Sequence, residues 1–467
     1  RSSMREKRLE YLAADRGPAR RPIVYDVYRD PSDLFAGGHA YQGGATRFHL
    51  LRCALGDQAF RSGLRQLIGG NLGASIDTAD VRDAFERAAG RDLGIFFEQW
   101  LHSPGYPEVE TRWTYDESRQ RVILTVNQVQ SVEDGTPSAF QAPVLVEVMG
   151  PSGPERVTVE MEKRRAKVEI PCAGEPRWVR FDKYRALPAE IRPDKAVEEW
   201  SAILEGDDDL EGRLDALVAL VRVQRVAAEQ SGGELDDSAD LGALLRRTLA
   251  EDAAEVVRAR AAQAVAAFGG GENRAALEAS VATDDSLVVR RASLEALAAW
   301  CPDPALAELA QTVYDDRESW ATMGSAARLR VAADPDTGLD WVRARLVEQS
   351  PNEILRRHLL SALGGLPTEA ATEELVRWLD DEAAFAEVRA EAARQLARRA
   401  PGGAPSARRA RRHLIDALEV PDGRLRRAVI ESLARVDDSE ARSALLTYRS
   451  RTPHARERHT IEAALTQ

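Results

Sequence analysis

An internal repeat in the C-terminal half of the sequence restricts the possible folds of this chain more than any other feature. Five segments share an arginine that follows a valine or leucine and leads into a stripe of small and apolar residues. These arginines are Arg258, Arg290, Arg356, Arg389 and Arg426. Successive arginines lie 32, 66, 33 and 37 residues apart, and the 66-residue step is two periods, with residues 320–333 in the gap.

A period of this length, with two helices per unit, is typical of an α-solenoid, because one unit cannot bury its apolar face without its neighbours. The array resembles HEAT/armadillo-like repeats, and we predict that it occupies residues 195–467. Its alanines and leucines are expected to pack between helices. Its recurrent arginines are expected to form hydrogen bonds between repeats or to face solvent. The concave surface of such an array could bind a protein partner.

The two regions that precede the repeat differ in their periodicity. Up to residue 103, apolar residues recur at helical spacing, with Asp77 expected to begin a helix and Gly56 and Gly90 to end helices. From about residue 108 onwards, apolar and polar residues alternate as they do in strands. Six or seven short antiparallel strands would form a small β-sandwich over residues 104–194.

Composition argues against several classes of protein. The formal net charge is −12, whereas binders of nucleic acid or of anionic membranes need an electropositive surface, so we predict neither partner. Cys53, Cys172 and Cys301 are far apart in the sequence, which argues against a disulfide framework and a clustered thiolate metal site. No run of about 18 apolar residues predicts a transmembrane helix.

The residues by themselves form no complete catalytic motif. No two of the seven histidines are four residues apart, so no helix presents the histidine pair of an H-E-x-x-H zinc site. The sequence also has no G-x-S-x-G, P-loop or G-x-G-x-x-G motif. Enzymatic chemistry therefore cannot be assigned from isolated motifs.

An ordered set of motifs between residues 21 and 107 is more informative. The set comprises Arg21-Pro22-Ile23-Val24-Tyr25, Tyr28-Arg29-Asp30-Pro31, Leu34-Phe35, His39-Ala40-Tyr41-Gln42-Gly43-Gly44-Ala45, Leu50-Leu51-Arg52, Leu55-Gly56-Asp57, Phe60, Phe96-Phe97-Glu98-Gln99-Trp100-Leu101 and Pro104-Gly105-Tyr106-Pro107. In order and spacing it resembles the aminopeptidase N-type zinc metallopeptidases, or gluzincins. The resemblance implies a multidomain, mainly α-helical chain. Residues 1–103 would be the C-terminal helical part of a thermolysin-like catalytic domain, followed by the β-sandwich and the α-solenoid.

The resemblance implies one catalytic residue in this chain. Tyr41 matches the tyrosine of the family's Tyr-x-Lys-Gly segment, whose hydroxyl would donate a hydrogen bond to the oxyanion formed when zinc-activated water attacks the scissile carbonyl. The family's lysine is Gly43 here. The family's zinc ligands lie upstream of this segment, so none is assigned in this chain. Phe96, Phe97 and Trp100 are interpreted as core residues.

We therefore predict part of a zinc aminopeptidase that hydrolyses N-terminal residues from peptides, with the solenoid capping the active-site cavity. The chain begins at Arg1, so it is expected to start inside a domain and to be inactive alone. The alternative is a non-catalytic, peptidase-like scaffold whose helical array binds a protein partner. Gly43 favours the scaffold and Tyr41 opposes it. The expected compartment is the cytoplasm, with a secreted or periplasmic parent left open.

Overall fold

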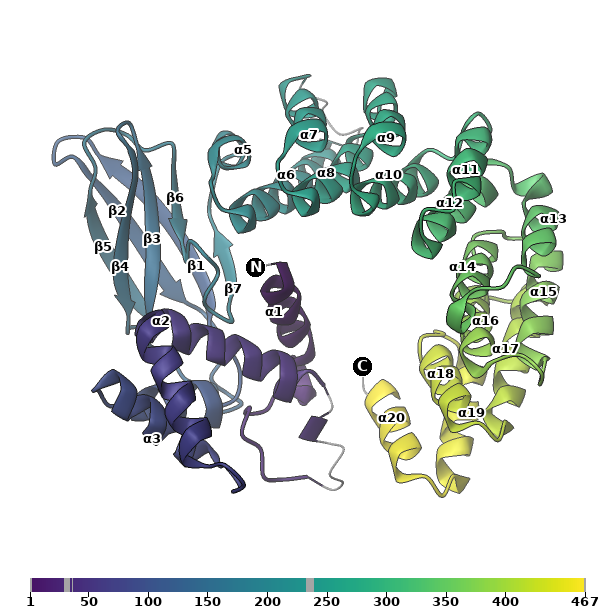
Figure 1. Ribbon diagram of the computed structural model, residues 1–467, viewed down its shortest axis with the longest axis horizontal. Helices are drawn as coiled ribbons and strands as arrows, with labels where there is room; N and C mark the ends of the chain where they lie inside the picture. Colours follow the sequence, from purple (N-terminus) through teal and green to yellow (C-terminus); the bar gives the residue numbers. More distant parts are fainter. Residues whose placement is uncertain (1, 29–33, 36, 232–238, 466–467) are drawn as a thin grey trace. The chain divides into compact units, whose positions relative to one another are not determined.

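The computed structural model describes residues 2–28, 34–35, 37–231 and 239–465, and Figure 1 shows the course of the chain. Arg29, Asp30 and Pro31, which belong to the ordered motifs, lie outside the described residues. The chain divides into two compact units, residues 1–236 (unit 1) and residues 237–467 (unit 2). The three domain ranges expected from the sequence stay a prediction.

Unit 1 begins with helices whose ends follow the sequence pattern. They are α1 (Ser2–Ala14), η1 (Gly17–Ala19), η3 (His39–Gly43), α2 (Gly44–Gly70), α3 (Thr78–Ala89), α4 (Gly94–Phe97) and η4 (Glu98–His102). Gly56 interrupts α2 with φ 77° and ψ 161°, a conformation that favours glycine. Asp77 caps α3 in a reciprocal capping box with Asp80, and Gly90 ends α3 at φ 65°. The three helix boundaries predicted at glycine and aspartate are confirmed.

Within the described residues, seven strands form two sheets. They are β1 (Glu108–Asp116), β2 (Arg121–Gln128), β3 (Ala142–Gly150), β4 (Gly153–Met161), β5 (Arg165–Pro171), β6 (Trp178–Phe181) and β7 (Glu190–Pro193). One sheet has the strand order β5-β2-β1-β7, and the other has the order β4-β3-β6. The expectation of antiparallel strands throughout is wrong at one edge, because β7 pairs with β1 in parallel. β7 reaches this edge only after the chain has passed through the other sheet, and such a crossover can bring a strand back in parallel.

Apolar side chains from both sheets and from two helices share one core. Trp100 of η4 and Leu50 of α2 are fully buried in the core of the sandwich. The indole nitrogen of Trp100 donates a hydrogen bond to the backbone oxygen of Gln141 at 3.0 Å. Phe97 is also buried and Phe96 is partly buried, so the interpretation of these aromatic residues as core is confirmed.

Two helices at the start of the range predicted for the solenoid lie in unit 1. These are α5 (Val197–Gly206) and α6 (Leu210–Ser231), which pack against each other. Ion pairs tie α6 to the first helix of the chain, because Arg5 lies 2.9 Å from both Glu211 and Asp215. Helices far apart in the sequence are therefore joined within this unit.

Unit 2 is helical throughout its described residues. Its helices are α7 (Ala239–Glu251), α8 (Glu255–Phe268), α9 (Gly271–Thr283), α10 (Leu287–Trp300), α11 (Leu306–Asp315), α12 (Trp320–Ala333), α13 (Pro335–Arg345), α14 (Ile354–Leu363), α15 (Glu369–Asp380), α16 (Ala386–Arg399), α17 (Pro405–Asp416), α18 (Gly423–Ala434), α19 (Ser439–Arg451) and α20 (Ala455–Leu465), with short turns η5 (Pro351–Glu353) and η6 (Ala417–Glu419). The even-numbered helices from α8 to α20 form a continuous row in which each helix contacts the next. The assignment of this array to HEAT-like repeats stays a prediction.

The recurrent arginines of the repeat bind the ends of preceding helices. Each donates a hydrogen bond of 2.8–2.9 Å to a backbone oxygen at or just past the C-terminus of the helix before it. The acceptors of Arg258, Arg290, Arg356, Arg389 and Arg426 are Asp252, Val281, Leu346, Leu379 and Val420 respectively. Helix C-termini leave carbonyl groups unpaired and carry partial negative charge, so a cation there is favourable. These arginines therefore hold successive helices together.

None of the helices in the described part of the chain combines the length and the apolar content that a bilayer crossing requires.

Candidate functional site

Tyr41 lies on a turn that leads directly into a long helix. The turn η3 is one π-helical turn, and Gly38 precedes it at φ 74°, which favours glycine. The Tyr41 side chain is exposed, with 67% of its surface accessible. Its ring lies 6.0 Å from that of Phe35, and its hydroxyl forms no hydrogen bond with any described residue. The phenol is therefore available to a ligand.

A buried polar network fixes the base of this turn. His39 Nε2 lies 2.9 Å from Asp15 Oδ1, and both side chains are almost completely buried. The Tyr11 hydroxyl donates to Asp15 Oδ2 at 3.1 Å and accepts from Arg47 at 2.6 Å. Burial raises the pKa of Tyr11, so its phenol stays protonated and able to donate. The network joins α1, η3 and α2, which holds the exposed tyrosine on a rigid support.

Packing explains the glycine that stands where the family has a lysine. A Cβ atom at Gly43 would lie 2.6 Å from Ile23 Cδ1 and 2.9 Å from Tyr11 Cδ2. These distances are shorter than van der Waals contact, so any larger residue would displace α1 or the segment around Ile23. Gly44 has open space at the same point. The departure from the family pattern at Gly43 therefore has a local steric cause.

The described residues offer one three-membered group of potential metal ligands, and it does not fit zinc. Glu147, Asp207 and Asp208 place carboxylate oxygens close together. Lys183 Nζ lies between them, at 2.5 Å from Glu147, 2.5 Å from Asp207 and 2.9 Å from Asp208. The ammonium group neutralises the three carboxylates together with Arg156 and Arg180. The group contains no histidine or cysteine, the ligands that zinc prefers. This cluster is an ion-pair centre of unit 1.

The pKa values of the cluster follow from these contacts. Burial disfavours the charged form of Lys183, but its hydrogen bonds to Asp207, Glu147 and Asp208 outweigh burial and raise its pKa. The hydrogen bond from Lys183, aided by Arg156, lowers the pKa of Asp208 to about 2. Both groups are therefore charged at neutral pH, as a structural ion pair requires.

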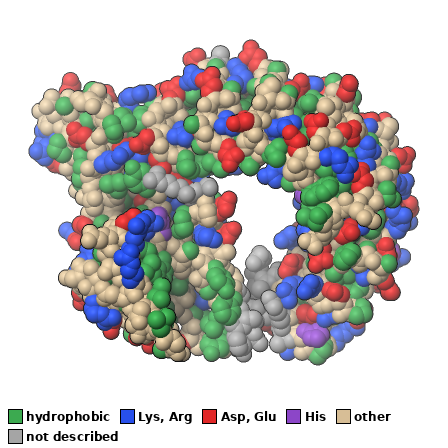
Figure 2. Space-filling model, viewed as in Figure 1, with side chains coloured by type: hydrophobic (Ala, Val, Ile, Leu, Met, Phe, Trp, Pro, Cys, Tyr) green, Lys and Arg blue, Asp and Glu red, His purple; other side chains and the backbone are tan. Residues whose placement is uncertain are grey.

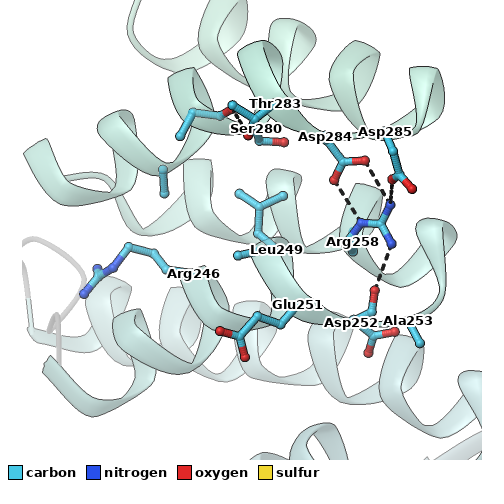
Figure 3. Close-up of a pocket in the computed structure, with 13 residues that line it drawn as sticks. Arg246, Leu249, Glu251, Asp252, Ala253, Arg258, Ser280, Thr283, Asp284 and Asp285 are labelled. Atoms are coloured by element: carbon cyan, nitrogen blue, oxygen red, sulfur yellow. Dashed lines mark hydrogen bonds and ion pairs between the residues drawn. The ribbon is translucent and has the colours of Figure 1, made fainter.

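A cavity of about 460 Å³ in unit 2 has Arg246, Arg258, Asp284 and Asp285 in its lining, and the charges of these four residues are paired. Figure 3 shows Arg258 pointing toward Asp284 and Asp285 in the cavity wall. Arg258 is hydrogen-bonded to Asp284 at 2.9 Å and to Asp285 at 2.7 Å. Arg246, on the opposite side, pairs with Glu272. The polar groups here stabilise the helix array and carry no catalytic constellation.

Comparisons with known proteins point to one kind of enzyme. Over 76 residues, 16% of this chain, the sequence is 36% identical to aminopeptidase N of Lactococcus lactis, and over 117 residues it is 31% identical to aminopeptidase N of Haemophilus influenzae. A crystal structure of Legionella pneumophila aminopeptidase A in complex with aspartic acid superposes on 96% of this chain, with a TM-score of 0.72 and 12% identity. The chain resembles aminopeptidase N-type enzymes. No family model matches it.

The resemblance covers only parts of the known aminopeptidases. The aligned segments span 9% and 13% of the Lactococcus and Haemophilus enzymes, and the chain spans 58% of the Legionella protein. At 12% identity, the structural likeness shows the aminopeptidase-like fold and not the chemistry. The activity of the complete aminopeptidases is therefore not transferred by likeness alone.

Sequence reasoning proposed Tyr41 as a site residue but did not single out the buried residues beneath it. Tyr11 and Asp15 are four residues apart at the end of α1, a spacing that places them on one helix face. That pattern is too common to single out without the fold. Lys183, in the separate ion-pair centre, carried a stronger signal, since it is one of only five lysines in the chain and stands next to Asp182, just after strand β6.

Proposed function

We propose that this chain is part of a zinc aminopeptidase that removes N-terminal residues from peptides, with Tyr41 as the donor that stabilises the oxyanion. The observation that carries the proposal is the exposed Tyr41 phenol, which stands above a buried hydrogen-bond network within the motif that resembles the family. A hydroxyl held in this way can donate to a developing negative charge without first breaking a bond to the protein.

The proposal places zinc and its ligands in a part of the enzyme outside these 467 residues. The ion would supply Lewis-acid chemistry there. Within this chain, the role of η3 is to orient the phenol, and that of the His39 and Asp15 pair is to hold η3 against α1. The chain by itself is expected to be inactive and to retain no stoichiometric zinc after dialysis against a chelator.

Substitution of Tyr41 in the full-length enzyme tests the assignment. Tyr41→Phe removes only the hydroxyl, so kcat on an aminoacyl anilide should fall about 10²–10³-fold with little change in KM. Tyr28→Phe is the matched control, because Tyr28 is also exposed in the same segment, and its activity should equal that of the wild type. An unchanged kcat for Tyr41→Phe would remove the catalytic assignment.

In the proposed enzyme the helical array of unit 2 caps the active-site cavity. Its row of helices offers an extended surface suited to limiting access. The scaffold alternative, in which the array only binds a protein partner, is favoured by the absence of the family's lysine at Gly43, although close packing against Ile23 and Tyr11 also gives this glycine a structural reason. If the full-length protein showed no peptidase activity on any peptide, the scaffold alternative would be favoured.

A further inference from the structure

Two arginines in the row of even-numbered helices have no hydrogen-bond or ion-pair partner among the residues that the structure describes. Arg291 of α10 and Arg357 of α14 form no hydrogen bond or ion pair with any described residue, and the Nε atom of each is buried. Their neighbours in sequence, Arg290 and Arg356, donate to helix carbonyls instead. A half-buried guanidinium with unused donors is costly unless something accepts from it. The two arginines therefore point to a ligand.

The helix between them contains a glycine that makes room for a histidine. Gly324 of α12 is the fifth residue after its helix cap, the position that Arg291 takes in α10. A Cβ atom at Gly324 would lie 2.5 Å from Cγ of His358, which α14 contributes. The imidazole therefore lies against the backbone of α12. We call Arg291, Gly324, Arg357 and His358 the notch.

The carboxylates near the notch are already paired. Glu295 of α10 accepts from Arg328 of α12 at 2.6 Å, and Glu391 of α16 accepts from Arg394 at 2.7 Å. The notch is therefore left with a surplus of positive charge. On the face in view, Figure 2 shows acidic and basic side chains interspersed.

The imidazole is neutral in these surroundings. Burial, followed by the charges of Arg328, Arg357 and Arg291, lowers the pKa of His358, and Glu391 opposes this only in part. A neutral imidazole can donate one hydrogen bond and adds no charge of its own. Three side chains on two helices thus offer donors, while the two unpaired guanidinium groups supply the charge.

We propose that the notch binds a small ligand with two negative charges on oxygen atoms, such as a phosphate group or a dicarboxylate. The planar donor fork of a guanidinium matches these oxyanions, and two guanidinium groups favour a dianion over a monoanion. This inference does not depend on Tyr41 or on the aminopeptidase proposal, since all of its residues lie in unit 2.

Calorimetric titration of the 467-residue chain with inorganic phosphate and, separately, with succinate at constant ionic strength tests the proposal. At least one of the two should bind saturably. Arg291→Gln with Arg357→Gln should weaken that binding at least about tenfold, since each lost charge-assisted hydrogen bond contributes substantially. Arg377→Gln with Arg424→Gln is the matched control, because both arginines are mostly exposed and the net charge changes equally. Binding by this control should match the wild type.

A third variant keeps the test decisive if the double variant fails to fold. Glu295→Gln leaves the notch intact but frees Arg328 from its carboxylate, so binding should become tighter. Phosphate alone as the bound probe identifies a phosphate-bearing ligand, and succinate alone identifies a dicarboxylate. No saturable binding of either probe, or equal binding by the wild type and the arginine double variant, overturns the proposal. Unchanged binding by Glu295→Gln also counts against it.

Discussion

The two units of this protein use buried and half-buried charges in different ways. In unit 1, Lys183 meets Glu147 and Asp207, which lie 36 and 24 residues away in sequence. In unit 2, each recurrent arginine donates to a carbonyl only six to ten residues before it. The first arrangement gathers many charges at one point that the fold creates. The second repeats one local contact along the chain.

This difference predicts where a single substitution does most damage. A buried cluster leaves uncompensated charges when one member is removed, because the remaining carboxylates cannot reach water. A repeated local contact loses one hydrogen bond and leaves its neighbours intact. We therefore expect large effects in unit 1 and small, similar effects along unit 2.

The largest effect is expected from Lys183→Met, which removes the cation that buried Glu147 and Asp207 share and leaves them with one arginine partner each, Arg156 and Arg180 respectively. The free energy of unfolding of unit 1 should fall by about 3–5 kcal/mol. Urea denaturation followed by tryptophan fluorescence measures it. Lys167→Met, at an exposed position in β5, is the control and should change stability little. A loss below about 1 kcal/mol for Lys183→Met would show that the cluster is solvated. It would contradict the expectation that substitutions of charged residues cost more in unit 1 than in unit 2.

The next effect concerns the support of Tyr41. Gly43→Ala would force a methyl group against Tyr11 and Ile23 and should destabilise the protein by about 1–3 kcal/mol. Thermal unfolding measures the change. Gly44→Ala is the control, because its methyl group would meet nothing within 4 Å, and alanine favours the helix. Equal melting temperatures for the two variants would contradict the close packing of α1 on η3.

A smaller effect is expected in unit 2. Arg389→Met keeps most of the aliphatic stem but removes the hydrogen bond of 2.8 Å to the Leu379 carbonyl, so the free energy of unfolding should fall by about 0.5–1.5 kcal/mol. Arg424→Met, whose side chain is 85% exposed, provides the reference for loss of charge. Urea denaturation monitored by far-UV circular dichroism compares them. A loss as large as that of Lys183→Met would mean that the repeated contacts act as one cluster.

The smallest effect is a change in pH dependence. The folded-state pKa of Asp208, about 2, lies below its ordinary value of 3.8, so its ion pairs stabilise the fold above the ordinary value. This contribution is lost as the pH falls from about 4 to about 2. Because Asp208 is 62% exposed, solvent weakens the effect. The melting temperature of Asp208→Asn should therefore vary slightly less over this range than that of the wild type. Asp336→Asn, exposed in unit 2, should follow the wild type.

Features with a local cause could be predicted from the sequence. The helix boundaries at Gly56, Asp77 and Gly90 depend on the φ angle or the capping group of one residue, and the structure has them in place. The strand regions followed from alternation. The parallel pairing of β7 with β1 did not, because strand direction at a sheet edge depends on the route of the whole connection.

The candidate site also has one part that the sequence could predict and another that depends on contacts between distant segments. The motif that contains Tyr41 could be recognised as a string of residues, whereas the support beneath it joins α1 to η3 through His39 and Asp15, 24 residues apart. The notch was also outside the reach of sequence reasoning. The repeat pattern singled out Arg290 and Arg356, but the arginines without a partner among the described residues are their neighbours Arg291 and Arg357. The role of Gly324 is visible only from His358, which packs against it.

The sequence alone therefore determined the repeating helices, the alternating strands and the resemblance to aminopeptidases. Each of these depends on residues that are close along the chain or that occur in a fixed order. Only the tertiary structure decided which charges are paired, why residue 43 is glycine and which arginines lack a partner among the described residues. Burial and contact between distant segments set the cost of an unpaired charge or a misplaced methyl group, and no local pattern records that cost.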